Sequence, residues 1–228
     1  MSNVPGRANW AQLFRIAYDL IRQANLKQIV IDNWTLGGGT AMMLQIDHRE
    51  SHDIDIFLND PRQLPFLDPQ KQDFEFEIRP DGYVGDGIRS LKLVFSIGEI
   101  DFIVAGALTS SPTTQCEIEG EIVQLETIPE IVTKKVFYRG SNVMPRDVLD
   151  IAAAGERSAD AIIEQLRVYK DEVTQTLAAM EKMNPIFVSD SIADLVVRAQ
   201  YKELTNTALE KSRRYLGPSD AMVAFPRD

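Results

Sequence analysis

The chain has 228 residues, of which 44% are hydrophobic and 25% charged, as is typical of a soluble globular protein with one large or two small domains. Its net charge of −10 argues against broad affinity for nucleic acid, because phosphate contacts require clustered Lys and Arg. No apolar run approaches the roughly 20 residues of a membrane span, and the N-terminus lacks a signal-peptide pattern. The single cysteine, Cys116, excludes an internal disulfide and indicates a reducing cytoplasm.

The first predicted element is a helix over residues 9–26, because apolar residues recur there about every 3.6 positions. Residues 29–36 are predicted as a strand that leads into Gly37-Gly38-Gly39-Thr40, and the apolar run 41–46 is predicted as a short helix. A helix that begins at Thr40 would direct its free N–H groups and its positive dipole end at an anion. The alternative is a plain strand-to-helix turn, in which glycine serves only a positive φ.

The segment Asp53-Ile54-Asp55-Ile56-Phe57-Leu58 alternates between polar and apolar residues and is predicted as a strand. Asp53 and Asp55 then point to one face, roughly 6.6 Å apart. Two neighbouring carboxylates suit a hard divalent cation such as Mg²⁺, although two solvated acids at a strand edge would show the same pattern. The combination of the glycine turn with this D-x-D strand predicts a site that holds a triphosphate by backbone amides and by a metal together.

Further strands are predicted at residues 73–79, 90–97, 100–104 and 117–125, so the middle of the chain is expected to form a sheet of at least five strands. Asp101 is the one charged residue of the segment 100–104. An acid in an apolar strand is unusual unless it is paired or metal-bound. Asp101 is therefore either an edge acid or a third carboxylate of the metal site, which could also accept the proton of an attacking hydroxyl.

From residue 128 onward the strand pattern ends and helices are predicted at 130–138, from 145 onward, at 158–183 and at 189–216, with Pro185 between the last two. The chain is accordingly predicted to consist of an α/β core over residues 1–126 and a helical region over residues 127–228. Asp147 and Asp150 lie one helical turn apart and share a face. For Asp147 the sequence favours helix capping and surface ion pairing.

Two signatures in this order resemble the AbiEii/AbiGii-type nucleotidyltransferase toxins. The first is G-G-T followed by a short helix and R-x-S-x-D-x-D, from Arg49 to Asp55, and the second is the segment K-K-V-F-Y-R-G followed by R-D-x-x-D, from Lys134 to Asp150. The resemblance implies an α+β fold with the polymerase β-like nucleotidyltransferase mixed sheet flanked by helices, and a C-terminal helical module. It also implies Mg²⁺-dependent transfer of a nucleoside monophosphate from an NTP to an acceptor hydroxyl.

The resemblance also implies roles for particular residues. Lys135 matches the essential lysine of the family, with Lys134 as the fallback, and Asp150 matches the final aspartate, which would hold that lysine or orient Arg146. The catalytic residues implied are Asp53, Asp55, Asp101, Lys135 and Asp150, and the first three of these are the implied metal ligands. The implied nucleotide-binding residues are Gly38, Gly39, Thr40, Arg49, Ser51 and Lys134. His48 and His52 match no family role.

Members of the resembled family are toxins of type IV toxin–antitoxin or abortive-infection systems. The resemblance therefore implies a cognate antitoxin protein as partner and the tRNA acceptor end as the target, with no membrane involved. Two alternatives remain: a nucleotidyltransferase that modifies a small-molecule hydroxyl, such as that of an antibiotic, and a non-catalytic nucleotide-binding module. The acidic net charge slightly favours the small-molecule acceptor, because no polyanion would have to bind.

Overall fold

Residues 9–27 and 31–217 are described by the computed structural model, and the chain divides into two units. The first unit comprises Met1–Gln45, Glu50–Ala107 and Ser111–Thr127, and the second comprises Ile46–Arg49, Leu108–Ser110 and Ile128–Asp228. The prediction of an α+β fold with a mixed sheet and helices is confirmed. The division into a core over residues 1–126 and a helical region over 127–228 stays a prediction.

The first unit is built on one seven-stranded sheet with the strand order β3-β4-β5-β2-β1-β7-β6. The strands are β1 (Trp34–Gly37), β2 (Ile54–Leu58), β3 (Gly82–Gly85), β4 (Ser90–Phe95), β5 (Gly98–Val104), β6 (Thr113–Ile118) and β7 (Glu121–Glu126). The pairs β2–β5 and β1–β7 are parallel and the others are antiparallel, so the sheet is mixed. Part of the strand predicted at 29–36 lies outside the described residues.

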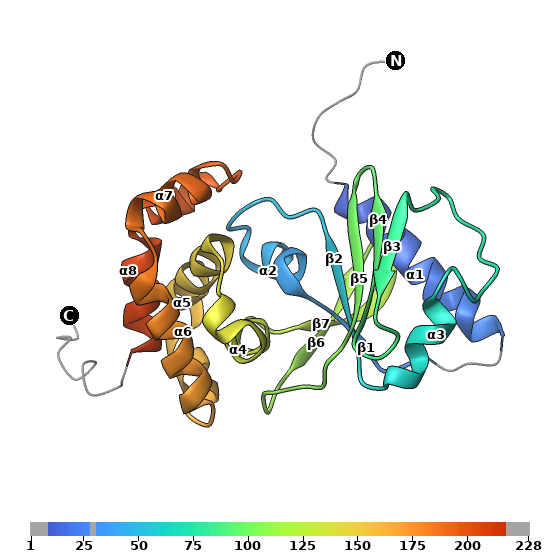
Figure 1. Cartoon of the computed structure of the whole chain (residues 1–228), viewed down its shortest axis with the longest axis horizontal. Helices are drawn as coiled ribbons and strands as arrows, with labels where there is room; N and C mark the ends of the chain where they lie inside the picture. Colours follow the sequence, from blue (N-terminus) through green and yellow to red (C-terminus); the bar gives the residue numbers. More distant parts are fainter. Residues whose placement is uncertain (1–8, 28–30, 218–228) are drawn as a thin grey trace, which may run out of the picture. The chain divides into compact units, whose positions relative to one another are not determined.

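Three helices belong to the first unit, namely α1 (Trp10–Leu26), α2 (Gly38–Ile46) and the short α3 (Leu64–Leu67), with the 3₁₀ turn η1 (Pro61–Gln63) before α3. Figure 1 shows α1 and α3 on one side of β2 and β5 and α2 on the other. The predicted apolar stripe of α1 is buried, with Leu13, Phe14 and Leu20 at the centre of the core. Alternate residues of β2 and β5 complete this core, as the period of two requires.

The strand predicted at residues 73–79 is absent from the structure, in which this segment is irregular. Its backbone groups bond to side chains of α1 and of the residue that follows it, not to a neighbouring strand. Gln23 of α1 donates to the carbonyl of Glu75 and accepts from its N–H, and Lys27, the C-cap of α1, donates to the carbonyl of Asp73. The single strand predicted at 117–125 is also wrong. It is a hairpin of β6 and β7 that turns at Glu119 and Gly120, both with positive φ.

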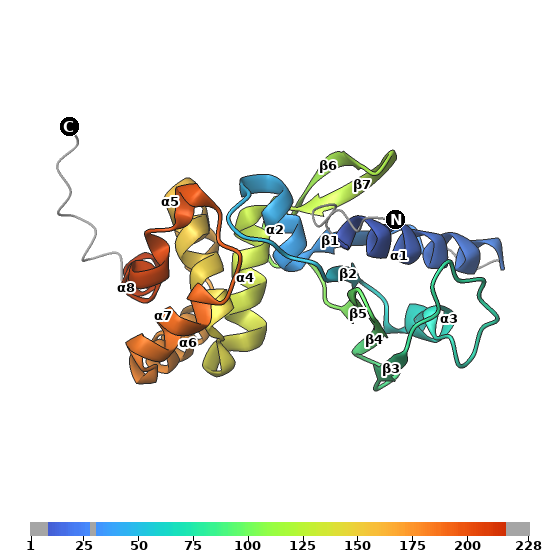
Figure 2. The same cartoon turned by 90° about the horizontal axis from the view of Figure 1, so that it is seen from above.

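The second unit contains the helices α4 (Ile128–Arg139), α5 (Pro145–Leu166), α6 (Lys170–Lys182), α7 (Pro185–Ala193) and α8 (Leu204–Leu216), with 3₁₀ turns η2 (Gly140–Asn142) and η3 (Ala199–Tyr201). Helix α8 packs along α5 (Figure 2). Gly155 of α5 lies directly against the Tyr215 ring of α8. Among the described residues, no helix combines the length and the apolar character that crossing a membrane requires.

Both long helices predicted for this region are interrupted. The helix predicted at 158–183 is divided between α5 and α6, and Ser158 has non-helical angles within α5. The helix predicted at 189–216 is divided between α7 and α8, with η3 in the gap. Pro185 occupies the first position of α7, where its missing N–H is not needed, and Asn184 caps that helix.

Candidate functional site

Two neighbouring strands of the first unit bring the predicted carboxylates together. Asp55 of β2 is the register partner of Asp101 of β5, and partners in a parallel pair point to the same face of the sheet. On the other face, Ile54, Ile56 and Phe102 are fully buried in the core. The hydrophobic alternation therefore determines the side on which both acids lie.

Asp53 immediately precedes β2 and is connected to β5 by a hydrogen bond. The backbone N–H of Glu99 donates to Asp53 Oδ1 over 3.0 Å. Asp53, Asp55 and Asp101 therefore belong to adjacent segments of one sheet, as the sequence predicted. Their roles in metal binding and catalysis stay predictions.

Lys92 and Glu99 are two residues of this region that the sequence analysis missed. Lys92 of β4 is the register partner of Asp101, and its Nζ lies 3.2 Å from Asp101 Oδ2 and also contacts the Glu99 carboxylate. Burial raises the pKa of Asp101, an effect that the neighbouring Lys92 partly offsets and that Glu99 and Asp53 reinforce. The E-x-D spacing of Glu99 and Asp101 repeats the D-x-D spacing of Asp53 and Asp55, so the sequence did contain a signal for Glu99 as a further acid of this region. Placing Lys92 beside Asp101 required knowledge of the strand order.

The glycine turn connects β1 to α2, which begins at Gly38, two residues earlier than expected. Gly38 has φ +67°, and a Cβ at this position would lie 1.8 Å from Asp55 Oδ2. A Cβ on Gly37 would lie 2.3 Å from a carboxylate oxygen of Glu126. Glycine is thus required both for the backbone angle and for the close approach to Asp55. Gly39 lies in the first turn of α2.

Thr40 differs from its predicted role as a ligand of the triphosphate. Its side chain is buried, and its hydroxyl donates to the backbone carbonyl of Asp53. The hydroxyl therefore ties the glycine turn to the start of β2, and only the backbone N–H remains as a group that could face an anion. Ser51, another predicted nucleotide ligand, directs its backbone N–H to the sulfur of Met43.

The donor chemistry of this face suits a hard divalent cation, since carboxylate oxygens are the ligands that Mg²⁺ prefers. A cation is in fact already in contact with Asp101, namely the ammonium group of Lys92. In the part of the chain that the structure describes, no three Asp, Glu, His or Cys side chains converge on a common point as metal ligands would. The residue types present thus fit the ion, whereas their orientations serve the contacts with Lys92 and with the Glu99 N–H.

The second unit contains a buried ionic cluster centred on Asp150. This fully buried carboxylate accepts hydrogen bonds from Arg49 over 2.7 and 3.0 Å, lies 2.8 Å from His48 Nε2, and pairs with Lys135 Nζ at 3.0 Å. Burial alone would raise the pKa of Asp150, but the charges of Arg49 and Lys135 and the hydrogen bond with His48 hold it well below its usual range. Asp150 is therefore ionised. Of the two residues that it was expected to hold or orient, Lys135 is its partner, whereas Arg146 is exposed.

The two candidate lysines have different partners. Lys135 pairs with Asp147 at 2.6 Å and with Asp150, whereas Lys134 lies 3.6 Å from Glu130. Glu130 is also buried, and it accepts from backbone N–H groups of the segment Leu108–Ser110. Lys134 therefore belongs to a contact that anchors this segment, and Lys135 belongs to the Asp150 cluster.

Asp147 has the capping role that the sequence favoured, since its carboxylate accepts from the Met144 N–H before α5. The expected surface ion pairing is wrong, however. Asp147 is fully buried, and its partners are Lys135 and, at 3.1 Å, Arg139. Arg49 is likewise buried against Asp150, so its guanidinium is engaged within the protein. His48, which the sequence left without a role, is a buried member of the same cluster.

A mixed sheet with acids on adjacent parallel strands, entered from a glycine turn, defines a protein of the nucleotidyltransferase class. The model of the nucleotidyl transferase AbiEii toxin family of type IV toxin–antitoxin systems matches residues 20–216, so the chain belongs to this family. The match confirms the predicted family and the predicted enzyme class, a nucleotidyltransferase toxin that uses an NTP. A type IV toxin–antitoxin family also implies an antitoxin as partner.

Several solved structures are similar to this chain. MenT4, a nucleotidyltransferase toxin from Mycobacterium tuberculosis H37Rv, has 17% identity and a TM-score of 0.48, with 92% of this chain and 89% of that chain covered. A candidate nucleotidyltransferase from H. pylori has 14% identity and a TM-score of 0.46, with 91% and 92% covered. An antigenic nucleotidyltransferase-like protein from Paracoccidioides brasiliensis has 13% identity and a TM-score of 0.41, with 86% and 97% covered. No curated protein matches this chain. At these TM-scores the activity is not inferred from the structural similarities; it is inferred from the family match.

Proposed function

We propose that this toxin acts in the cytoplasm and, with Mg²⁺, transfers a nucleoside monophosphate from an NTP to a hydroxyl at the tRNA acceptor end. The observation that supports the transfer site best is the register of Asp55 with Asp101, directly beside the Gly38 turn. The acceptor is the one that the family resemblance implies. Such a transfer would block the end of tRNA that carries the amino acid and would stop translation.

Residues of the first unit would position the metal, the triphosphate and the attacking hydroxyl for this reaction. Asp53, Asp55 and Asp101 would hold Mg²⁺, whose charge offsets that of the phosphates when it is bound. The N–H groups at the start of α2, from Gly38 and Gly39, bind the triphosphate with the positive end of the helix dipole. Asp101 accepts the proton of the attacking hydroxyl.

Lys135 is the lysine that we assign to the neutralisation of phosphate charge as pyrophosphate leaves. The support is its pairing with Asp150, the residue that ends the second signature, whereas Lys134 pairs with Glu130. Asp150 orients the ammonium group, and His48 and Arg49 orient Asp150 in turn. For Arg49 this contact supports a positioning role in place of the predicted contact with the nucleotide.

A small-molecule hydroxyl is the second candidate acceptor. The observation that favours it is the net charge of −10, since an acidic protein binds a polyanion such as tRNA weakly. A hydroxyl-bearing antibiotic would not meet this long-range repulsion. The two candidates share all steps at the NTP and differ only in the molecule that receives the nucleotide.

Labelled NTPs, total tRNA and a panel of hydroxyl-bearing small molecules test the proposal in one assay. We expect label on tRNA with the wild type in Mg²⁺, and none after EDTA or with Asp53→Ala. Asp81→Ala, which removes an exposed acid of the same unit, should retain activity. Label on a small molecule alone would support the second candidate. Absence of label on every acceptor, with NTP binding intact, would make the protein a non-catalytic nucleotide-binding module.

A further inference from the structure

The metal face of the first unit carries a fourth acid in addition to the three proposed metal ligands. Glu99 and Asp101 are two residues apart on β5, just as Asp53 and Asp55 are two residues apart beside it. The Glu99 N–H bonds to Asp53, and Asp101 is in register with Asp55, so the acids form two side-by-side pairs. Neighbouring carboxylates repel one another unless cations lie among them.

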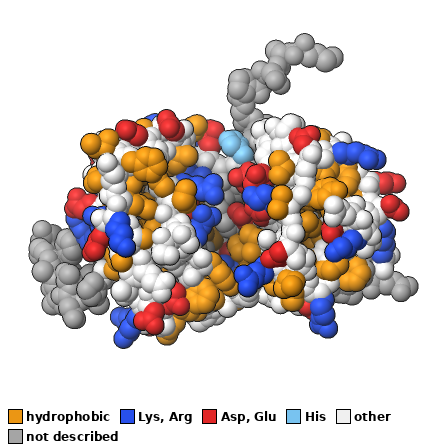
Figure 3. Space-filling view, in the orientation of Figure 1, with side chains coloured by type: hydrophobic (Ala, Val, Ile, Leu, Met, Phe, Trp, Pro, Cys, Tyr) orange, Lys and Arg blue, Asp and Glu red, His pale blue; other side chains and the backbone are white. Residues whose placement is uncertain are grey.

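Lys92 is the cation that the chain itself supplies to this group. It projects from β4, its Nζ lies 3.2 Å from Asp101 Oδ2, and it contacts the Glu99 carboxylate as well. Its side chain is 36% exposed and that of Asp101 is 19% exposed, so the pair is open to solvent and to ions. Figure 3 shows a basic side chain surrounded by acidic ones over the start of β2.

A divalent ion bound at Asp101 and the ammonium group of Lys92 repel each other, so each weakens the contact of the other with this carboxylate. Lys92 has a second partner in Glu99, and an ammonium group has three donors on a flexible stem. Lys92 can therefore leave Asp101 without losing all ionic contact. Glu99, on the same strand, would keep it beside the site.

We infer that Lys92 is a positioning residue that competes with the divalent metal: it holds Asp101 before the ion binds and pairs with Glu99 alone afterwards. The inference rests on the proposed Mg²⁺ dependence of the transfer. It assigns to Lys92 and Glu99 a role in setting metal affinity, with Glu99 as the acceptor of the displaced lysine. Glu99 is then not a ligand of the ion.

Binding of Mn²⁺ to the nucleotide-free full chain, measured by electron paramagnetic resonance of the free ion, tests this role without any activity readout. We expect Lys92→Met to bind Mn²⁺ about tenfold more tightly than the wild type, because a competing charge is removed. Lys92→Arg retains a competing charge and should bind much like the wild type. Lys71→Met removes a lysine that pairs with Asp68 elsewhere in the unit, and it should also leave the affinity unchanged.

Glu99→Gln decides between a lysine acceptor and a metal ligand. If Glu99 draws Lys92 away, Glu99→Gln weakens Mn²⁺ binding severalfold in the wild type and has little effect in the Lys92→Met background. Equal weakening in both backgrounds would make Glu99 a ligand and would overturn the inference. Unchanged or weaker binding by Lys92→Met would overturn it as well, provided that the variant melts like the wild type.

The proposed function and the inference fail in different ways. If the wild type binds Mn²⁺ and Asp53→Ala abolishes this binding, the proposed metal site stands whatever Lys92 does. If neither the wild type nor Lys92→Met binds Mn²⁺, with or without an NTP, the proposed metal dependence fails and the competition fails with it. Equal Mn²⁺ affinity of the wild type and Lys92→Met removes the inference alone.

Discussion

Asp150 is a fully buried carboxylate with three partners of positive or potentially positive charge, Arg49, Lys135 and His48. A depressed pKa means that the folded protein keeps this group ionised at a pH where the unfolded chain already binds a proton. The group therefore stabilises the fold above the ordinary aspartate pKa of about 3.9. This contribution is lost as the pH falls from there through the lower pKa of the folded state.

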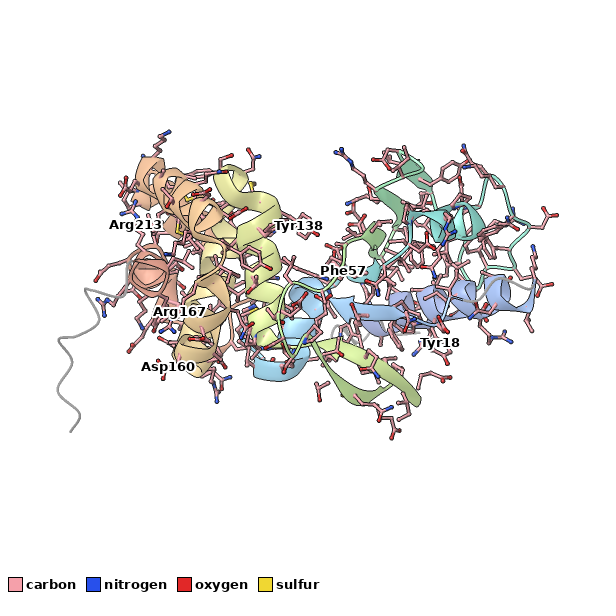
Figure 4. The ribbon with its side chains drawn as sticks, turned by 90° about the horizontal axis from the view of Figure 1, so that it is seen from below. Tyr18, Phe57, Tyr138, Asp160, Arg167 and Arg213 are labelled. Atoms are coloured by element: carbon pink, nitrogen blue, oxygen red, sulfur yellow. The ribbon has the colours of Figure 1, made fainter. Side chains whose placement is uncertain are left out.

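Replacing Asp150 by asparagine should destabilise the protein by about 3–5 kcal/mol, because Arg49 and Lys135 would remain buried without that anionic partner. Urea unfolding at neutral pH measures this difference. Asp160→Asn is the matched control, since Asp160 is an exposed acid of the same helix (Figure 4), and it should change the stability by less than about 0.5 kcal/mol. Equal effects of the two substitutions would show that the Asp150 cluster contributes nothing to stability.

The pH dependence of the unfolding free energy of the wild type and of Asp150→Asn gives a second prediction. The wild type should exceed Asp150→Asn in unfolding free energy by a constant amount at pH 6–8, roughly two units or more above the ordinary aspartate pKa. Below about pH 4 the gap should narrow, because the unfolded wild type then gains a proton at Asp150 that the folded state lacks. A gap that widened on acidification would contradict a depressed pKa.

At the scale of the elements, the glycine turn determines where Asp55 can lie. Gly38 begins α2 with φ +67°, and the space that a Cβ would need is occupied by the Asp55 carboxylate. The close approach of the turn to β2 therefore depends on the absence of a Cβ atom at Gly38. A second close approach of this kind lies in the second unit, where the absence of a Cβ at Gly155 of α5 leaves room for the ring of Tyr215 from α8.

Gly38→Ala should lower stability by about 1–3 kcal/mol, since the left-handed backbone strain alone is about 1–2 kcal/mol. It should also abolish transfer, because the new methyl group displaces the Asp55 carboxylate. Gly82→Ala is the control: a Cβ there meets nothing within 4 Å. Thermal unfolding and the transfer assay check both effects. Full activity of Gly38→Ala would show that Asp55 is not part of the transfer site.

Gly155→Ala should also destabilise, by about 1–3 kcal/mol, although alanine is the better helix former. The reason is that a Cβ would lie 2.1 Å from a ring carbon of Tyr215, so α5 and α8 would have to separate. Combining the substitution with Tyr215→Ala should recover part of the loss, as a double-mutant cycle by urea unfolding would show. Purely additive losses would mean that this contact does not limit the packing.

At the scale of the whole molecule, the net charge of −10 opposes the approach of any polyanion. We therefore expect binding to bulk tRNA to be weak and to change by less than about tenfold between 50 and 200 mM salt, because few phosphate contacts are formed. Fluorescence anisotropy with labelled tRNA measures this dependence. A steep loss of affinity with salt, as for a protein with many phosphate contacts, would show that local basic groups outweigh the net charge.

The chain's sequence by itself determined the elements and residues whose signals are local. Local sequence patterns predicted β2, β4 and β5, and the two signatures predicted the family that the family match confirms. Only the tertiary structure decided the strand order, which sets Lys92 beside Asp101, and the Asp150 cluster, which joins His48 to a helix about a hundred positions later. The segment 73–79 shows the reason: alternation reports a preference for an extended backbone, but a strand also needs a partner, and here α1 supplies the hydrogen bonds instead.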